Sequence, residues 1–197
     1  MPQTMFGRES DLILKIDFLK KLGVRHATVQ NLGHIPLLND FVLHGGFSLN
    51  IANSESVEFL DSVGFNDFIV STECSLETIS TIRKKMSLGI IAAGRLPLMV
   101  SRNCPVNVSC DVCRHSSNLL DRKGKLFPVR CYKDCYKIFN SDVLWMADRQ
   151  RELKNVDFEV LKFTIEDKSE AEMTIKNFIQ KVKLTSNYTR GLYYRGI

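Results

Sequence analysis

Apolar positions along the chain follow two spacings, and stretches of the two kinds alternate. Leu and Ile recur at helical spacing over residues 10–22, which predicts a helix that Ser10 caps and Gly23 ends. Further helices are expected at three places: after Asn53, after Ser75 and over residues 169–182. Short apolar runs predict strands at 26–30, 41–44, 67–71, 88–93 and 159–165.

Short apolar strands separated by single helices are typical of an α/β fold with a parallel sheet covered on both faces. Such a sheet is either a (β/α) barrel or an open, doubly wound sheet. A closed eight-stranded barrel takes about 250 residues, whereas this chain has 197 residues. The length therefore predicts one domain, residues 1–197, with an open sheet or a part of a longer barrel.

The alternation stops over residues 94–140, where Cys, Pro, Asn, Arg and Gly accumulate. A β-hairpin over 118–129, turning at Arg122, Lys123 and Gly124, is expected there in place of a helix. We interpret 94–140 as a cysteine-rich insertion within the domain.

Five of the six cysteines lie in this insertion, spaced C-x5-C-x2-C-x17-C-x3-C. They are Cys104, Cys110, Cys113, Cys131 and Cys135. Crowded thiols in a reducing compartment favour metal binding over disulfides, and thiolates select zinc or an iron-sulfur cluster. The spacing does not choose between these two, nor between Cys131 and Cys135 as the fourth ligand. Cys74 lies elsewhere and is interpreted as a small, semi-buried residue.

Composition and charge narrow the classes of function. Hydrophobic residues make up 44% and charged residues 25%, as in a folded globular protein. No apolar run approaches the roughly 20 residues of a membrane span, and the first residues lack the pattern of a secretory signal, so a cytoplasmic location is expected. The net charge of +5 permits a polyanionic partner. Four histidines are present without an HExxH, GxSxG or papain-like pattern.

Several strings in a fixed order make the chain resemble the peptidase family U32, also called collagenase-like proteases. They are NLG (31–33), HGGFSLNIANS (44–54), GRLPLMVSRNCP (94–105), the CxxC at Cys110 and Cys113, LLDRKGKLFPV (119–129), CYKIFNSDVLWMAD (135–148) and TRGLYYRG (189–196). The resemblance begins near residue 30. It implies the C-terminal part of the U32 catalytic domain: a partial TIM-like (β/α) barrel with a cysteine-rich insertion, its first strands missing here.

The resemblance also implies a chemistry. Some members are named as proteases, and others act in oxygen-independent hydroxylation of RNA bases or of the ubiquinone ring, with a [4Fe-4S] cluster on four cysteines. Carried over, the ligands are Cys104, Cys110, Cys113 and Cys135. Pro97 stands where one branch of the family has a cysteine within an HGAMC-type string. A partner chain, or the missing N-terminal barrel half, is expected to complete the fold.

The leading expectation is thus an iron-sulfur U32 enzyme that hydroxylates bases of tRNA or rRNA, or a small aromatic substrate. The alternatives are a zinc-stabilised binding or assembly module and a genuine peptidase. Pocket residues of a barrel lie at strand ends, so we predict substrate-binding roles for His44, beside Gly45 and Gly46, and for Arg95. Turn, core or ion-pair roles for these two side chains remain the alternatives. No catalytic residue is identified from the sequence.

Overall fold

A computed structural model describes all residues except 5–6, 107–108, 114–115, 133–134, 186 and 196–197. The chain forms two compact units. Unit 1 comprises Met1–Ile91, Arg151–Val160 and Gly191–Ile197, and unit 2 comprises Ala92–Gln150 and Leu161–Arg190. The single domain over 1–197 and the insertion at 94–140 stay predictions.

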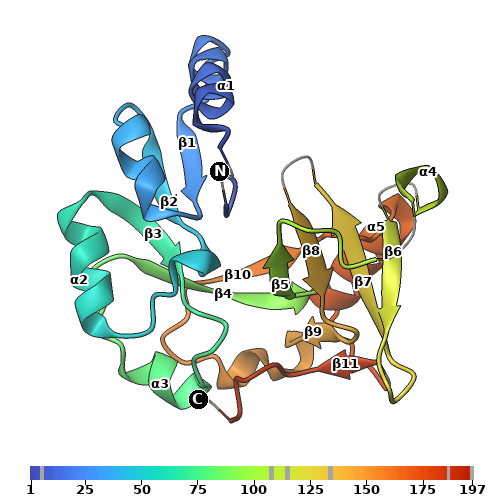
Figure 1. Ribbon diagram of the computed structural model, residues 1–197. Coiled ribbons are helices and arrows are strands. Elements are labelled where there is room, and N and C mark those ends of the chain that lie inside the picture. Colours follow the sequence, from blue (N-terminus) through green and yellow to red (C-terminus); the bar gives the residue numbers. More distant parts are fainter. Residues whose placement is uncertain (5–6, 107–108, 114–115, 133–134, 186, 196–197) are drawn as a thin grey trace. The chain divides into compact units, whose positions relative to one another are not determined.

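Unit 1 is built on parallel strands connected by helices, as the alternating pattern predicts. Its helices are α1 (Glu9–Lys21), η1 (Leu32–Leu37), η2 (Phe47–Leu49), α2 (Ser54–Ser62) and α3 (Leu76–Thr81). Its strands are β1 (His26–Val29), β2 (Val42–Gly45), β3 (Phe65–Ile69), and the larger parts of β4 (Ser87–Gly94) and β10 (Phe158–Lys162), both of which continue into unit 2. The order β1-β2-β3-β4 is parallel throughout (Figure 1).

Strands β1 to β3 have one buried face, which contacts the helices, whereas β4 is buried on both faces. Gly45 lies on this face, because a Cβ there would come within 2.8 Å of Phe68 and 3.3 Å of Leu60 in α2. Phe68 and Leu60 are both fully buried. Side chains on the opposite face, such as Thr28 and Val42, are exposed. The core of unit 1 therefore lies between the sheet and α2.

Local signals correctly predicted three helices of unit 1, and at the first of them only the cap residue was wrong. Asn53 caps α2 in a capping box with Ser56, and Ser75 caps α3. The cap predicted at Ser10 is wrong, because α1 begins at Glu9 after Arg8, whose side chain makes no capping bond. A surface helix packs against the rest of the protein along one apolar stripe, and this packing supplies most of its stability. In α1 that stripe is Leu12 and Ile16, whereas the other predicted core positions, Ile13, Leu19 and Leu22, are exposed.

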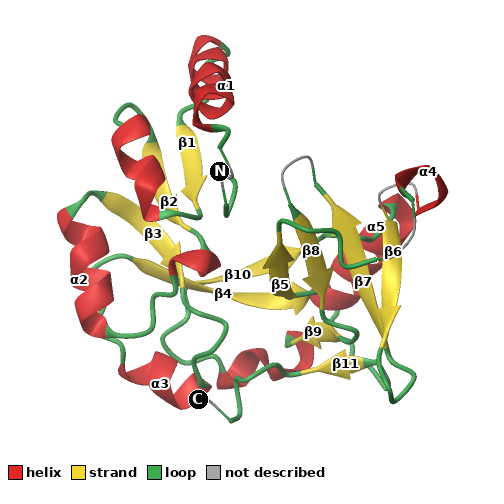
Figure 2. Ribbon diagram, viewed as in Figure 1, coloured by secondary structure: helices red, strands yellow, loops and turns green. Residues whose placement is uncertain are grey.

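Unit 2 contains a four-stranded antiparallel sheet in the order β5-β8-β7-β6 (Figure 2). Its strands are β5 (Pro97–Ser101), β6 (Ser116–Leu120), β7 (Leu126–Cys131) and β8 (Tyr136–Phe139). The hairpin predicted from the sequence is confirmed as β6 and β7. Asp121 Oδ1 accepts hydrogen bonds from the backbone N–H groups of Lys123 and Lys125, and Gly124 has a φ of +76°.

Unit 2 also contains the ends of β4 and β10, which begin in unit 1. Its further elements are α4 (Cys110–Cys113), β9 (Val143–Trp145), α5 (Lys168–Ile179), β11 (Tyr188–Thr189) and most of η3 (Ala147–Glu152). The end of β4 pairs antiparallel with β9, and β9 pairs parallel with β11. In α5, Phe178 is buried against Trp145, but Ile175 and Ile179, predicted on the same apolar face, are exposed.

The fold is therefore mixed α/β, with parallel and antiparallel sheets. The strands of the described residues do not close into a barrel. None of the helices in the described part of the chain combines the length and hydrophobicity that a membrane crossing requires.

Candidate functional site

The cysteine-bearing segments of the insertion all lie at one end of the antiparallel sheet in unit 2. At this end Ser101, the last residue of β5, pairs with Tyr136, the first residue of β8. Tyr136 pairs in turn with Cys131, the last residue of β7. Ser116, the first residue of β6, pairs with Arg130. Because the strands are antiparallel, these four strand ends form one row.

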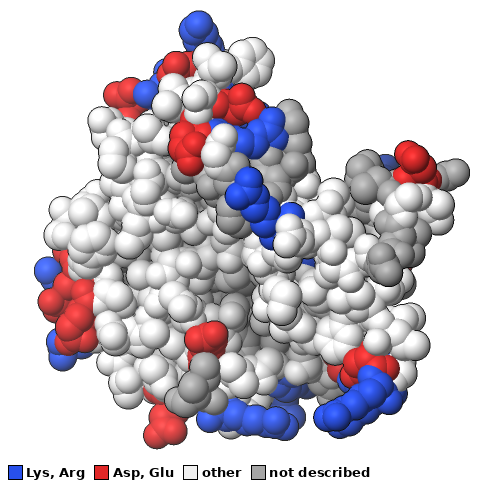
Figure 3. Space-filling model, viewed as in Figure 1, with Lys and Arg blue, Asp and Glu red and all other residues white. Residues whose placement is uncertain are grey.

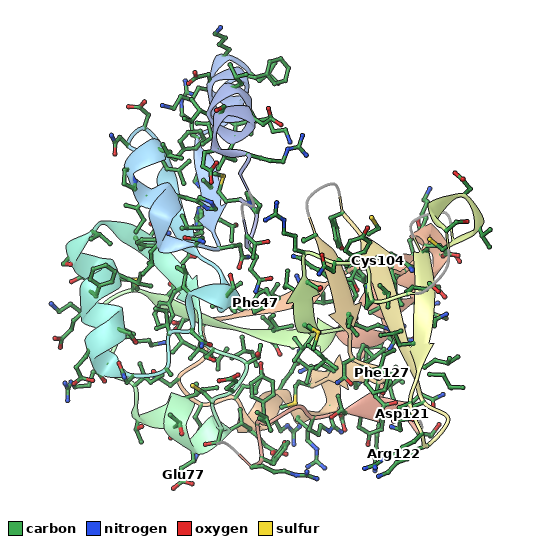
Figure 4. The ribbon with its side chains drawn as sticks, viewed as in Figure 1. Phe47, Glu77, Cys104, Asp121, Arg122 and Phe127 are labelled. Carbon is green, nitrogen blue, oxygen red and sulfur yellow. The ribbon has the colours of Figure 1, made fainter. Side chains whose placement is uncertain are left out.

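Each cysteine of the insertion lies in this row or close to it along the chain. Cys131 ends β7, Cys135 immediately precedes β8, Cys104 follows β5, and α4 from Cys110 to Cys113 precedes β6. Figure 4 shows Cys104 at this end of the sheet, with Asp121 and Arg122 at the opposite end. The backbone topology thus brings together segments that are more than twenty residues apart in the sequence.

The thiols themselves differ in exposure. Cys104 is exposed, Cys113 and Cys131 are half-buried, and Cys135 is buried; all four are free thiols. The Cys110 side chain lies outside the described residues. Cys104 Sγ lies 3.3 Å from the carbonyl oxygen of Val106, a backbone acceptor. Within the described residues, no three His, Cys, Asp or Glu side chains are grouped so that they could hold a metal ion.

The donor set nevertheless has the chemistry of a soft-metal site. Free thiols become thiolates on coordination, and thiolates are the ligands of zinc and iron-sulfur centres. A cluster or zinc ion would require Cys104, Cys113 and Cys135 or Cys131 to turn toward one point at the row of strand ends. The choice between Cys131 and Cys135 stays open, because both flank the same β7–β8 connection.

Cys74 is separate from this group. It lies in unit 1 and is buried, and its Sγ lies 3.9 Å from the carbonyl oxygen of Ala52. Burial, with a smaller contribution from Glu73, raises the pKa of the thiol. A raised pKa lowers the thiolate fraction, so Cys74 has the properties of a structural cysteine.

His44, predicted to contact substrate, belongs to a chain of three side chains on three neighbouring strands of unit 1. His44 Nδ1 lies 2.7 Å from Asp67 Oδ2, and His44 Nε2 lies 2.9 Å from His26 Nδ1. The two imidazole rings are stacked, with centroids 5.2 Å apart. Asn66 Nδ2 also donates to Asp67 Oδ2, at 3.0 Å. The sequence prediction found His44 but missed His26 and Asp67.

Arg95 lies in unit 2 after the end of β4. Its guanidinium donates to the backbone carbonyl oxygens of Asn140, at 2.9 Å, and of Ser141. These bonds connect the β4–β5 turn to the β8–β9 turn. The structure therefore gives Arg95 a role in holding two turns together, and its binding of substrate stays a prediction.

The aromatic residues near the C-terminus are packed. Tyr193 is 2% exposed, and its hydroxyl donates to the carbonyl oxygen of Ile91 at 2.8 Å. In unit 2, Arg190 lies over the Tyr188 ring, 4.7 Å from its centroid. Packing of this segment thus accounts for Tyr193.

A cleft of about 590 Å³ lies in unit 1 near the starts of β3 and β4. Its charged lining residues form ion pairs: Lys84 with Asp157, and Lys85 with Asp61. The opposite charges compensate one another, so the cleft offers an ionic ligand no excess of one sign. On the face of the molecule drawn in Figure 3, the Lys and Arg side chains likewise form several small groups, most of them beside Asp or Glu.

One comparison with known proteins gives a match. The family model "Peptidase family U32" matches residues 8–183, which is most of the chain and includes residues of both units. The chain therefore belongs to peptidase family U32. No curated protein and no solved structure matches it significantly.

Proposed function

We propose that this U32 chain is an iron-sulfur enzyme that acts in oxygen-independent hydroxylation of RNA bases or of a small aromatic substrate. One observation supports the cluster: the register of β5, β8, β7 and β6 directs the segments that carry the five cysteines of the insertion to one end of the sheet. A cluster held there would supply one-electron transfer.

The proposed ligands are Cys104, Cys110, Cys113 and Cys135, with Cys131 as the alternative to Cys135. The insertion can supply a complete thiolate set by itself, because its segments converge without help from other parts of the chain. Among the described residues, none of these cysteines is in a disulfide.

The proposal extends to the fold. Four parallel strands in sequential order, with helices between them, are what a segment of a (β/α) barrel contains. We therefore propose that β1 to β4 are part of a TIM-like barrel whose remaining strands come from a partner chain or from a further part of the protein. The strand β1 is at the edge of the sheet, and such strands would add there.

Metal analysis tests the cluster directly. The full chain is purified anaerobically, and iron, acid-labile sulfide, zinc and the visible spectrum are measured for the wild type and for C113S. We expect about four iron and four sulfide per chain, with broad visible absorption that C113S loses. The matched control is C74S, the same substitution at a buried thiol of unit 1, which should keep the iron.

Other outcomes separate the alternatives. Stoichiometric zinc without sulfide would overturn the redox proposal in favour of a zinc-stabilised binding module, and the absence of bound metal would overturn both. Comparing C131S with C135S then identifies the fourth ligand, because only the variant that removes a ligand should lose iron. If iron is present, mass spectrometry of RNA incubated with the reduced protein tests the hydroxylation.

A further inference from the structure

The two hydrogen bonds that join His26, His44 and Asp67 in unit 1 have a fixed donor-to-acceptor direction. An ionised Asp67 can only accept hydrogen bonds, so His44 Nδ1 must donate to it. In a neutral imidazole the other nitrogen is then an acceptor, and His44 Nε2 must receive the proton on His26 Nδ1. The same rule leaves His26 Nε2 with its lone pair free. Both rings are thereby held in the Nδ1–H tautomer.

The free nitrogen is accessible. His26 is exposed at the start of β1, which is the edge strand of the sheet, and the structure shows no hydrogen bond to its Nε2 from a described residue. His44 and Asp67 are more enclosed, with side-chain exposures of 25% and 19%. His44 precedes Gly45, whose α-carbon faces α2, so the imidazole points to the opposite, open face of the sheet.

A β-bulge in β3 aligns Asp67 with His44. Leu43 pairs with Phe65 and His44 with Asp67, so Asn66 is an extra residue in β3. Bulges are rare in parallel pairs, and they re-aim side chains next to functional sites. Without the extra residue, His44 would be opposite Asn66. The bulge thus places the carboxylate beside the imidazole, and Asn66 adds a second hydrogen bond to the same oxygen.

We propose that His26, His44 and Asp67 form a proton relay in which His26 Nε2 is a general base for water in the hydrolysis of acyl compounds, esters or amides. The water oxygen bonds to the acyl carbon while its proton moves to His26 Nε2. When the carbon–oxygen or carbon–nitrogen bond breaks, that proton passes to the leaving group. No electrons are transferred, so water is the sole co-reactant.

The roles within the relay differ. His26 is the catalytic residue, because only its nitrogen reaches the reacting water. His44 and Asp67 are positioning residues that set the tautomer and stabilise the imidazolium formed during the reaction, as a buried carboxylate does in hydrolase triads. The site lies wholly within unit 1 and does not depend on the cysteines of unit 2.

The activity test uses the full chain and p-nitrophenyl acetate as the probe. The protein-dependent rate of nitrophenolate release is compared between the wild type, H26Q, D67N and D40N. H26Q and D67N should lower the histidine-dependent rate by about 10²-fold, the lower end of general-base effects. D40N is the matched control, since Asp40 is an exposed carboxylate of unit 1 bound to Lys20. The thiols are common to all four proteins, so differences report on the relay.

Two further measurements do not depend on the variants being stable. Nitrogen NMR of the wild-type imidazoles should show the Nδ1–H tautomer for both His26 and His44. Diethyl pyrocarbonate should modify His26 faster than His34, which is fully buried. An unchanged rate in H26Q, Nε2–H tautomers in the wild type, or slower labelling of His26 than of His34 would each overturn the proposal.

Discussion

Removing the carboxylate of Asp148 should destabilise unit 2 strongly. Arg190 donates to both oxygens of Asp148, at 2.6 and 2.8 Å, and also to the carbonyl oxygen of Trp145. The two side chains are only 16% and 11% exposed. Each charge-assisted bond is worth about 1.5–3 kcal/mol, and an amide at position 148 keeps one of the two acceptors. We therefore expect D148N to lower the free energy of unfolding by about 3 kcal/mol, as for other enclosed ion pairs that lose one partner.

The assay is urea denaturation followed by tryptophan fluorescence. Trp145 is the only tryptophan of the chain, and its own carbonyl accepts the bond from Arg190. The matched control is D142N, because Asp142 pairs with Lys125 in a more exposed bridge of the same unit, for which about 0–1 kcal/mol is expected. A thermal midpoint shift of about 6–12 °C for D148N corresponds to the predicted loss in a chain of this length. Equal destabilisation in D148N and D142N would refute the reasoning.

The same pair predicts a pH dependence. Hydrogen bonds from Arg190, more than its charge, hold the pKa of Asp148 below its ordinary value. A carboxyl whose folded pKa is depressed contributes stability that is complete above the unfolded pKa of about 3.9 and is lost as the pH falls through the folded value. Wild-type unit 2 should thus lose stability below about pH 4. D148N should lack this component of the acid sensitivity, and identical acid profiles would contradict the assignment.

Two further substitutions test packing in unit 1 by circular dichroism during urea denaturation. Y193F removes the hydroxyl that donates to Ile91 O, so a loss of about 1 kcal/mol is expected; no loss would contradict a stabilising role for this hydrogen bond. G89A places a methyl group 2.2 Å from the Phe158 ring, which should cost about 1–3 kcal/mol. The exposed Ser87 of the same strand is the control, and S87A should change stability by less than about 0.5 kcal/mol.

Features encoded by neighbouring residues could be predicted from the sequence. The caps at Asn53 and Ser75 depend on a side chain that reaches the backbone only three residues away. The β6–β7 hairpin likewise depends on Asp121 and Gly124, which meet the demands of the turn within four residues. These signals lie entirely within a short window, so no knowledge of the rest of the fold is needed to read them.

Features that depend on distant pairing could not be predicted. The strand β5 has no alternation of buried and exposed positions, because the adjacent Leu98 and Met99 are both exposed, and it was missed. The partners of His44 were missed for a related reason. His26 and Asp67 are 18 and 23 residues away, and the bulge at Asn66 that aligns Asp67 has no local sequence signature. The signal available in the sequence was a polar residue at a corresponding position in each of three successive strands, namely His26, His44 and Asp67.

The two candidate sites differ in what the chain alone can provide. The relay of unit 1 already has its hydrogen bonds in place, so its activity requires only water and substrate. The cysteine site has converging segments but no grouped side chains among the described residues, so ligand binding must order it, and metal binding should stabilise unit 2 selectively. Trp145 reports on unit 2, and the tautomers of His26 and His44 report on unit 1. Adding iron and sulfide should therefore raise the unfolding midpoint that Trp145 reports for unit 2. The tautomers of His26 and His44 should stay unchanged.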